Sequence, residues 1–338
     1  MAKVKHHTTS AAQRREQERV QRGQRNQVAR NQARSRRSKK SSRNAWLIVG
    51  VTVVLLVLLI VGFVLLGNNK PSQKAVTVKS TVYQSLTNVK PALLSQVGAG
   101  SVSSGLSSVL KPVKNTPVLK GPNGKPQVFY MGGEFCPYCG AQRWAMIVAL
   151  SRFGTFTTAP SPLVSGELSV PTFSFFNSAY KSDYIDFVPV EVSDNSQPNP
   201  KPLQKLTPEQ QQLVNTYDAP PYTSAASAGS FPFISVGNQY VSAGAYFPHD
   251  ILIGNTHDYI VSQLQDPTTD ISRAVLGSAN YLTAQICKIT NNQPGSVCNA
   301  DPIPSLQGKL PQASLSTGNT VVTNSVLPQA IETRKRIA

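Results

Sequence analysis

The segment Cys136-Pro137-Tyr138-Cys139 constrains the fold of this chain more than any other feature. It follows an apolar, strand-like run at 128–131 and opens a helix-like stretch at 142–153. The N-terminus of a helix presents unpaired backbone N–H groups and the positive end of the helix dipole, which both favour a thiolate over a thiol. The sequence therefore predicts a strand, a dithiol and a helix in that order, which is the setting that a redox-active dithiol requires.

The two cysteines are predicted to have different roles. Cys136 is the candidate nucleophile, because a thiolate is the species that attacks a disulfide. Cys139 follows one helical turn later and can return to the same sulfur, which would resolve a mixed disulfide between Cys136 and a substrate. Pro137 suits the first helical turn, since its φ is fixed near the helical value and its missing N–H is not needed there. We therefore predict Cys136 and Cys139 as the catalytic pair.

An uncharged run at 45–66 predicts a single transmembrane helix. Its 22 residues match the length that crosses a bilayer as a helix. A cleaved signal peptide is the alternative, but this run is longer than a signal-peptide core and no small-residue cleavage site follows it. Residues 1–44 hold 14 Lys or Arg against two Glu and are predicted to be a disordered tail. By the positive-inside rule the tail is cytoplasmic, so we expect a single-pass protein of the cell membrane with an extracytoplasmic C-terminal domain.

The basic tail also raises the possibility of nucleic-acid binding, through the run at 34–40. Topology and attraction to anionic lipid head groups account for such a run beside a membrane helix. The tail also has no aromatic residue on which a base could stack. We therefore expect the lipid bilayer, and no nucleic acid, as the partner of this segment.

The part of the chain beyond the membrane segment divides by composition. Residues 67–119 are interpreted as a linker with a weakly specified helical lead-in, and residues 301–338, rich in Pro, Ser, Asn and Thr, as a flexible C-terminal tail. Between them, strands are predicted at 127–131, 172–176 and 184–192, a hairpin at 231–241, and helices at 136–153, 207–217, 256–264 and 270–290. This pattern indicates one α/β domain over residues 120–300.

The order of strand, Cys-x-x-Cys, helix, strand, Pro, hairpin and closing helix resembles the thioredoxin fold over about residues 120–290. Residues 133–139, Gly-Glu-Phe-Cys-Pro-Tyr-Cys, are similar to the thioredoxin signature, and the inner Pro-Tyr is typical of glutaredoxins. With Cys287 and Cys298 near its end, the whole chain most resembles the membrane-anchored, thioredoxin-like proteins of the domain of unknown function 929 family. The resemblance implies a thioredoxin-like fold, a central mixed sheet flanked by helices with helical and loop insertions, but no demonstrated reaction.

The resemblance also implies a substrate-binding surface. Pro232 matches the cis-proline that lies beside the active disulfide in such enzymes and presents backbone to the substrate peptide. Phe231, Pro137 and Tyr138 complete the predicted substrate-binding set.

A buried acid that helps to move the proton of the resolving cysteine is the other feature implied by the resemblance. Tyr130, six residues before Cys136, occupies its position, so the acid itself is missing. Glu134 is nearer in sequence but is expected to be exposed. Proton transfer is therefore left to water or to a group that the sequence does not identify.

The second cysteine pair, Cys287 and Cys298, is interpreted as a structural disulfide. Turn-forming residues separate the two, and an extracytoplasmic compartment permits disulfides. A redox relay to Cys136 and Cys139 is the alternative. A Cys₄ zinc centre is a third reading, but the spacing is not that of two Cys-x-x-Cys knuckles and no His lies nearby in the sequence. No metal or other cofactor is expected, and His257 is expected on the surface.

These features predict a membrane-anchored extracytoplasmic thiol–disulfide oxidoreductase that forms, isomerises or reduces disulfides. Its expected partners are exported proteins that carry thiols or disulfides, with a membrane redox partner as a further hypothesis. The alternative is a non-catalytic binding or scaffold protein of thioredoxin fold in which Cys136 and Cys139 form a structural disulfide, because a fold does not by itself fix a function.

Overall fold

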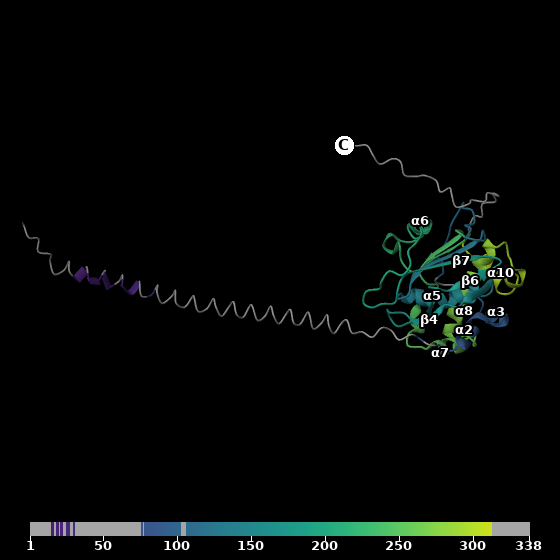
Figure 1. The fold of residues 1–338 in the computed structure, drawn as a ribbon, viewed down its shortest axis with the longest axis horizontal. Helices are drawn as coiled ribbons and strands as arrows, with labels where there is room; N and C mark the ends of the chain where they lie inside the picture. The colour runs from purple at the N-terminus through teal and green to yellow at the C-terminus, as the bar shows by residue number, and fades with distance from the viewer. Residues whose placement is uncertain are drawn as a thin grey trace, which may run out of the picture. The chain divides into compact units, whose positions relative to one another are not determined.

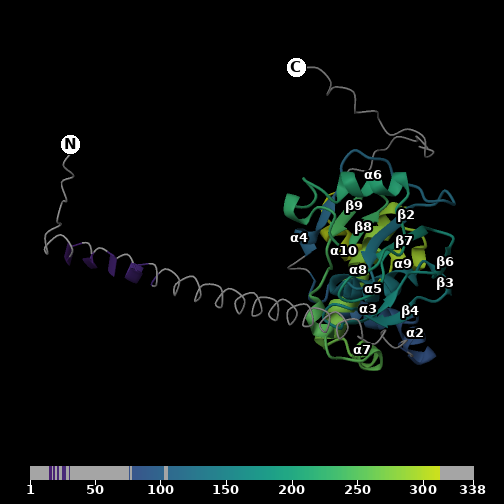
Figure 2. The same cartoon turned by 60° about the vertical axis from the view of Figure 1, so that its left-hand side comes forward.

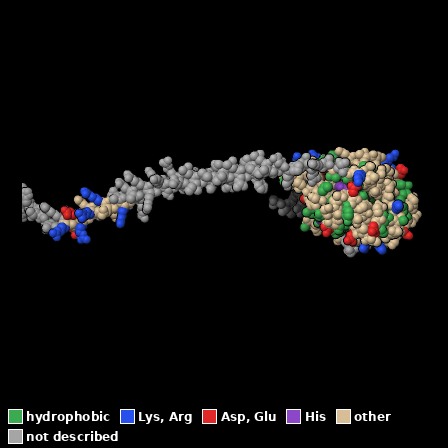
Figure 3. Space-filling model, turned by 90° about the horizontal axis from the view of Figure 1, so that it is seen from below, with side chains coloured by type: hydrophobic (Ala, Val, Ile, Leu, Met, Phe, Trp, Pro, Cys, Tyr) green, Lys and Arg blue, Asp and Glu red, His purple; other side chains and the backbone are tan. Residues whose placement is uncertain are grey.

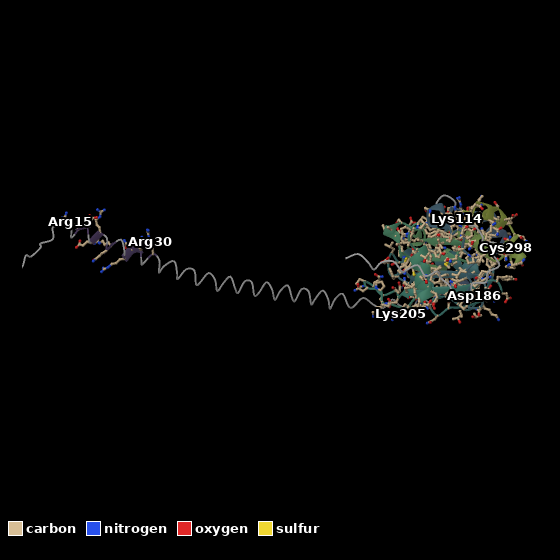
Figure 4. All side chains as sticks on the ribbon, turned by 90° about the horizontal axis from the view of Figure 1, so that it is seen from above. Arg15, Arg30, Lys114, Asp186, Lys205 and Cys298 are labelled. Atoms are coloured by element: carbon tan, nitrogen blue, oxygen red, sulfur yellow. A yellow bond between two sulfur atoms is a disulfide. The ribbon has the colours of Figure 1, made fainter. Side chains whose placement is uncertain are left out.

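The computed structural model describes residues 76, 78–102 and 106–312, together with part of the segment 15–30. The chain divides into two units, Met1–Ser72 and Gln73–Ala338. In the first unit the described residues, which include Arg15 and Arg30 (Figure 4), are helical and exposed. The sequence predicted a disordered tail here. Arg, Glu and Gln dominate this segment and all three favour helices.

Two predicted segments lie outside the described residues, namely the transmembrane helix at 45–66 and the part of the tail beyond residue 312. Within the described parts of the chain, no helix has both the length and the apolar character that crossing a bilayer demands.

A five-stranded mixed sheet forms the centre of the second unit (Figure 1). Its strands are β1 (Leu110–Pro112), β2 (Gln127–Gly133), β7 (Asp186–Ser193), β8 (Phe233–Val236) and β9 (Tyr240–Ala243). Their spatial order is β1-β9-β8-β2-β7, in which β2 and β7 are parallel and the other neighbours are antiparallel. The predicted α/β class, with a mixed sheet flanked by helices, is confirmed.

Strand β2 is buried on both of its faces. Phe129 and Met131 belong to a core cluster shared with α6 (Pro208–Tyr217), whereas Val128 and Tyr130 belong to the larger cluster shared with α5 (Pro137–Leu150) and α8 (Asp270–Ile289). Figure 2 shows α6 on one side of the sheet and α5 and α8 on the other. Alternate side chains of a strand point to opposite faces, so an almost continuous apolar run suits this central position.

The start of α6 and the predicted hairpin form as their sequences indicate. Thr207 Oγ1 accepts a hydrogen bond from the backbone N–H of Gln210, whose side-chain oxygen accepts one from Thr207 N–H, so the capping box is confirmed. Gly237 and Asn238 both take positive φ angles between β8 and β9. Gly and Asn adopt such angles more readily than other residues, so the predicted hairpin turn is confirmed.

An insertion between α5 and β7 contributes two small sheets. Its strands are β3 (Gly154–Thr158), β4 (Ser161–Val164), β5 (Pro171–Ser174) and β6 (Ala179–Ser182), which pair as β3 with β6 and β4 with β5. Only β5 was predicted, because it is fully buried, whereas the other three are partly exposed and therefore lack a clear apolar pattern. The insertion is tied to α5, since Trp144 Nε1 donates to the carbonyl of Pro171 over 2.8 Å.

The folded region begins earlier than residue 120, where the sequence placed the start of the domain. The lead-in forms α2 (Ser80–Thr87), α3 (Pro91–Val97) and α4 (Leu106–Val109). Leu86 and Leu94 are buried in the larger core cluster, and Asn280 Nδ2 on α8 donates to the carbonyls of Leu94 and Gly98, each over 2.8 Å. These helices are therefore part of the fold rather than of a linker.

The folded region also extends beyond residue 300. Its remaining helical segments are η1 (Ala225–Ser227), η2 (His249–Leu252), α7 (His257–Gln263), α9 (Gly295–Cys298) and α10 (Ile303–Lys309). The predicted flexible tail at 301–338 is wrong for residues 301–312, because Ile303, Leu306 and Leu310 are buried in the larger core cluster. Their spacing is that of one apolar face of a helix, a signal that the Pro-rich and Ser-rich composition obscured.

Cys287 and Cys298 form a disulfide between the end of α8 and α9, and Figure 4 labels Cys298 in this segment. We expect the double variant Cys287→Ala/Cys298→Ala to lose roughly 3 kcal/mol of unfolding free energy, because the cross-link restricts a short loop of the unfolded chain. Urea unfolding without a reductant measures this loss. The rate at which Cys136 and Cys139 turn over with a disulfide peptide and glutathione should stay unchanged in the same variant, and a lower rate would favour the relay instead.

Candidate functional site

The dithiol lies where β2 passes into α5. Strand β2 ends in a register shift against β7 at Gly132 and Gly133. Cys136 is the N-cap of α5, and its Sγ accepts a hydrogen bond from the backbone N–H of Cys139 over 3.3 Å. Both cysteines are free thiols in this structure. The sulfur of Cys136 therefore takes the position that a side-chain oxygen takes in an ordinary helix cap.

The environments of the two thiols shift their pKa values in opposite directions. The pKa of Cys136 is lowered, chiefly by the hydrogen bond from the Cys139 side chain, with help from backbone N–H groups and the charge of Arg143 and against the effect of burial. Burial raises the pKa of Cys139 well above its ordinary value, and its hydrogen bond to Cys136 acts in the same direction. Cys136 is 6% exposed and Cys139 is 0% exposed. Cys136 is thus the slightly exposed, more acidic thiol and Cys139 the fully buried one.

The predicted substrate-binding residues Phe231 and Pro232 lie against Cys136. The Sγ atom of Cys136 is 4.0 Å from the carbonyl oxygen of Phe231, and the Phe231–Pro232 peptide bond is cis. The ring of Phe231 packs edge-on against that of Phe135, with 6.3 Å between the centroids. The structure therefore brings a backbone edge and two aromatic rings to the dithiol.

Pro137 and Tyr138 lie between the two cysteines in the first turn of α5. Pro137 is buried at the first position of α5, whereas Tyr138 is 49% exposed. The ring of Tyr138 contacts that of His249 with centroids 4.4 Å apart, which adds a residue to the surface beside the dithiol that sequence reasoning did not single out. Over the face of this unit seen in Figure 3, basic and acidic side chains are scattered among each other.

A buried ion pair lies beneath the dithiol, and sequence reasoning missed it. Arg143 Nε and Nη2 donate to the two carboxylate oxygens of Glu191 over 2.9 and 2.7 Å, and both side chains are fully buried. Arg143 Nη2 also donates to the carbonyl of Gly133 over 2.7 Å, and Glu191 accepts from the N–H of Phe175 over 3.2 Å. A signal existed, because an Arg within an apolar helix and a Glu within an apolar strand have opposite charges and no access to water.

Two further expectations about polar side chains are wrong. Glu134 is not exposed but half-buried, where it accepts a hydrogen bond from Ser174 Oγ over 2.6 Å, and burial raises its pKa. His257 is not a surface residue, because it is 4% exposed, packs between Trp144 and Phe173, and contacts the Thr172 carbonyl through Nε2 at 2.6 Å. The insertion, whose strands the sequence did not predict in full, covers both residues.

The two cysteine pairs lie at opposite ends of β8. A Cβ atom added to Gly237, after β8, would lie 2.8 Å from Ile289, two residues beyond Cys287. Pro232, before β8, lies next to the residue that faces Cys136. The disulfide takes two of the four sulfurs that a Cys₄ zinc centre would need. Elsewhere in the described residues, no group of three or more His, Cys, Asp or Glu is arranged to hold a metal ion.

Comparison with known protein families gives a match for the central part of the chain. Residues 111–288 match the model of a family described as a domain of unknown function, DUF929. The chain belongs to this family. The DUF929 region contains Cys136, Cys139 and Pro232 together with the Arg143–Glu191 pair, and it ends one residue after Cys287. No curated protein and no solved structure gives a match to the chain.

We expect Cys136 to react with iodoacetamide at a lower pH than an ordinary cysteine does, because its pKa is lowered. The Cys139→Ala variant should shift this reaction to higher pH, since it removes the hydrogen bond that contributes most to the lowering. Alkylation rates across a pH series, with the modified residue identified by mass spectrometry, measure both effects. Equal reactivity of Cys136 and Cys139 at every pH would contradict the assigned asymmetry.

Proposed function

We propose that this protein is a thiol–disulfide oxidoreductase that is anchored in the membrane and acts outside the cytoplasm on exported proteins. The observation that carries the proposal is the unequal pair at the start of α5, where Cys136 Sγ accepts a hydrogen bond from Cys139 N–H and the two thiols differ in acidity and exposure. Such a pair separates the attacking thiol from the resolving thiol.

In the reducing direction, the Cys136 thiolate attacks one sulfur of a substrate disulfide and releases the other as a thiolate, which then takes up a proton. Cys139 next loses its proton and attacks Cys136 Sγ, which breaks the mixed disulfide and releases the second substrate thiol. The products are a Cys136–Cys139 disulfide and a reduced substrate. The oxidising direction reverses these steps, and isomerisation uses the first step and its reversal.

The arrangement of the sheet supports a thioredoxin-like fold as the finer description. In the order β9-β8-β2-β7, β2 and β7 are parallel, β8 and β9 are antiparallel, and the dithiol follows β2. A mixed sheet with the dithiol between a strand and a helix is what the resemblance implies for that fold. Strand β1 and helices α2 to α4 are additions at its N-terminal side.

The surface around Cys136 supports a substrate that presents an extended peptide. The Phe231 carbonyl and the backbone before β8 offer main-chain groups beside the sulfur. Tyr138 in the first turn of α5 offers an exposed aromatic ring next to the buried Pro137. Main-chain contacts with apolar flanks suit varied sequences, so we propose that the protein acts on many exported substrates rather than on one.

The membrane part of the proposal rests on the run at 45–66 and its basic flank, which lie outside the described residues apart from a few positions. A membrane redox partner that recycles the dithiol is proposed from this topology. It predicts a mixed disulfide between Cys136 and a membrane protein in cells that carry the Cys139→Ala variant.

The deciding measurement is the reduction potential of Cys136–Cys139 in the full chain, equilibrated with glutathione buffers. We expect a value above about −230 mV, as in glutaredoxins and protein disulfide isomerase, because the Cys136 thiolate is stabilised in the reduced form. The Cys139→Ala variant should also trap exported proteins as mixed disulfides. A potential below about −300 mV with no trapped protein would overturn the proposal in favour of a scaffold with a structural disulfide.

A further inference from the structure

Two polar atoms beneath the dithiol have no hydrogen-bond partner among the described residues. They are the hydroxyl oxygen of Tyr130 and the Nη1 atom of Arg143, and both side chains are 0% exposed. A buried polar group without a partner costs free energy, and a charged one costs more. Hydrogen bonds to Glu191 and to the Gly133 carbonyl satisfy the other two guanidinium nitrogens, Nε and Nη2. The Nη1 atom is therefore free to donate to another group.

Gly132 brings the Tyr130 hydroxyl and the Cys139 sulfur to the same place. A Cβ atom added to Gly132 would lie 2.2 Å from Tyr130 Oη and 3.0 Å from Cys139 Sγ. The first distance is shorter than real Cβ contacts and the second is tighter than most, so the hydroxyl and the sulfur both border the space over this glycine. The glycine is needed here for close approach rather than for a positive φ, since Gly132 is not among the residues with one.

Arg143 completes this arrangement from α5. It follows Cys139 by four residues and therefore lies on the same side of the helix one turn later. Its Cζ atom lies 5.8 Å from the centroid of the Tyr130 ring, within the range of a cation–π contact. The resolving sulfur thus has a hydroxyl group on the β2 side and a buried positive charge on the α5 side.

We infer that Tyr130 and Arg143 stabilise the thiolate of Cys139 during the resolving step, Tyr130 as a neutral hydrogen-bond donor and Arg143 as a buried positive charge. The inference deepens the proposed function and rests on it for the reaction step. It also assigns the group that takes the place of the missing buried acid. Partnerless groups beside a neutral thiol gain a partner when that thiol ionises.

The proton balance of the step needs no further acid. Cys139 loses its proton, its sulfur bonds to Cys136 Sγ, the bond from Cys136 to the substrate sulfur breaks, and the departing substrate thiolate takes the proton. Tyr130 cannot itself be the base at neutral pH, because burial raises its pKa well above the ordinary value. It keeps its proton and directs it toward the new negative charge.

The other titratable groups around Cys139 set the sign of the expected effects. Besides burial, Cys136 at the N-cap of α5 and Glu191 on β7 raise the pKa of Cys139, whereas Arg143 lowers it. Glu134 interacts with Glu191 and Arg143 at the half-buried end of this group. Removing the charge of Glu191 should therefore lower the pKa of Cys139. Removing the Tyr130 hydroxyl should raise this pKa, because the thiolate would lose the inferred hydrogen bond.

The first test is the Tyr130→Phe variant of the full chain in single-turnover reaction with a disulfide peptide. We expect the resolving step to slow roughly 10-fold near neutral pH, since a hydrogen bond to a charged group is lost. The pH at which the rate of this step rises should shift to a higher value. Formation of the first mixed disulfide should keep its rate. The melting temperature should not fall, because the hydroxyl has no partner in the reduced protein.

Tyr180→Phe is the matched control. It removes a tyrosine hydroxyl that donates to the carbonyl of Leu150 at the opposite end of α5, over 2.8 Å. This variant should leave the resolving rate and its pH profile unchanged. A Tyr130→Phe variant that behaves in the same way would overturn the inference.

A titration separates the inference from the proposed function. In a Cys136→Ala background with isotope-labelled cysteine, the Cβ chemical shift of Cys139 reports its ionisation without any catalytic reaction. We expect Tyr130→Phe to move the midpoint to higher pH and Glu191→Gln to move it to lower pH, and general damage to the fold would not produce opposite shifts. If the Cys139 midpoint shifts in both variants as expected but the Cys139→Ala variant traps no mixed disulfide, the proposed function is wrong and the inference about Cys139 still holds. If Glu191→Gln does not fold, the Tyr130→Phe midpoint still decides, and an unchanged midpoint refutes the inference.

Discussion

The buried ion pair of Arg143 and Glu191 is the interaction on which the site depends. It joins α5 to β7, and through Gly133 and Phe175 it also holds the end of β2 and the insertion. A fully buried pair is weak evidence for added stability, because desolvation offsets much of the attraction. Its value here is geometric. Neither partner can be released without leaving an uncompensated charge in the core, so α5, β7, the end of β2 and the insertion are held in one arrangement.

The central position of β2 gives this arrangement its rigidity. The strand has hydrogen-bonded neighbours on both edges and core clusters on both faces. These contacts fix the position of its C-terminal end, where α5 begins. Burial then makes the two thiols unequal. Cys136 keeps slight exposure and gains donors from the helix start, while Cys139 is fully buried beneath it, near a Tyr130 hydroxyl and an Arg143 Nη1 atom that have no partner among the described residues.

Sequence patterns predicted the elements whose signals are local. Strand β2, the dithiol, α5, the capping box of α6 and the hairpin at Gly237 lie where residue type and periodicity placed them. Patterns were less informative where burial comes from distant segments. The insertion strands, the packing of α2 and α3, the burial of His257 and the helix α10 depend on partners far away in the chain.

The sequence by itself determined the dithiol and its place between a strand and a helix, because a helix cap and an apolar strand are decided within a few neighbouring residues. It also contained both members of the ion pair as isolated charges in apolar segments. The resemblance carried by the sequence also placed Phe231 and Pro232 beside the dithiol. Only the tertiary structure decided that Arg143 meets Glu191 and that Tyr130 and Cys139 both border the space over Gly132. The physical reason is that these contacts join residues on different elements, whose distances are set by packing of the whole core rather than by local backbone preference.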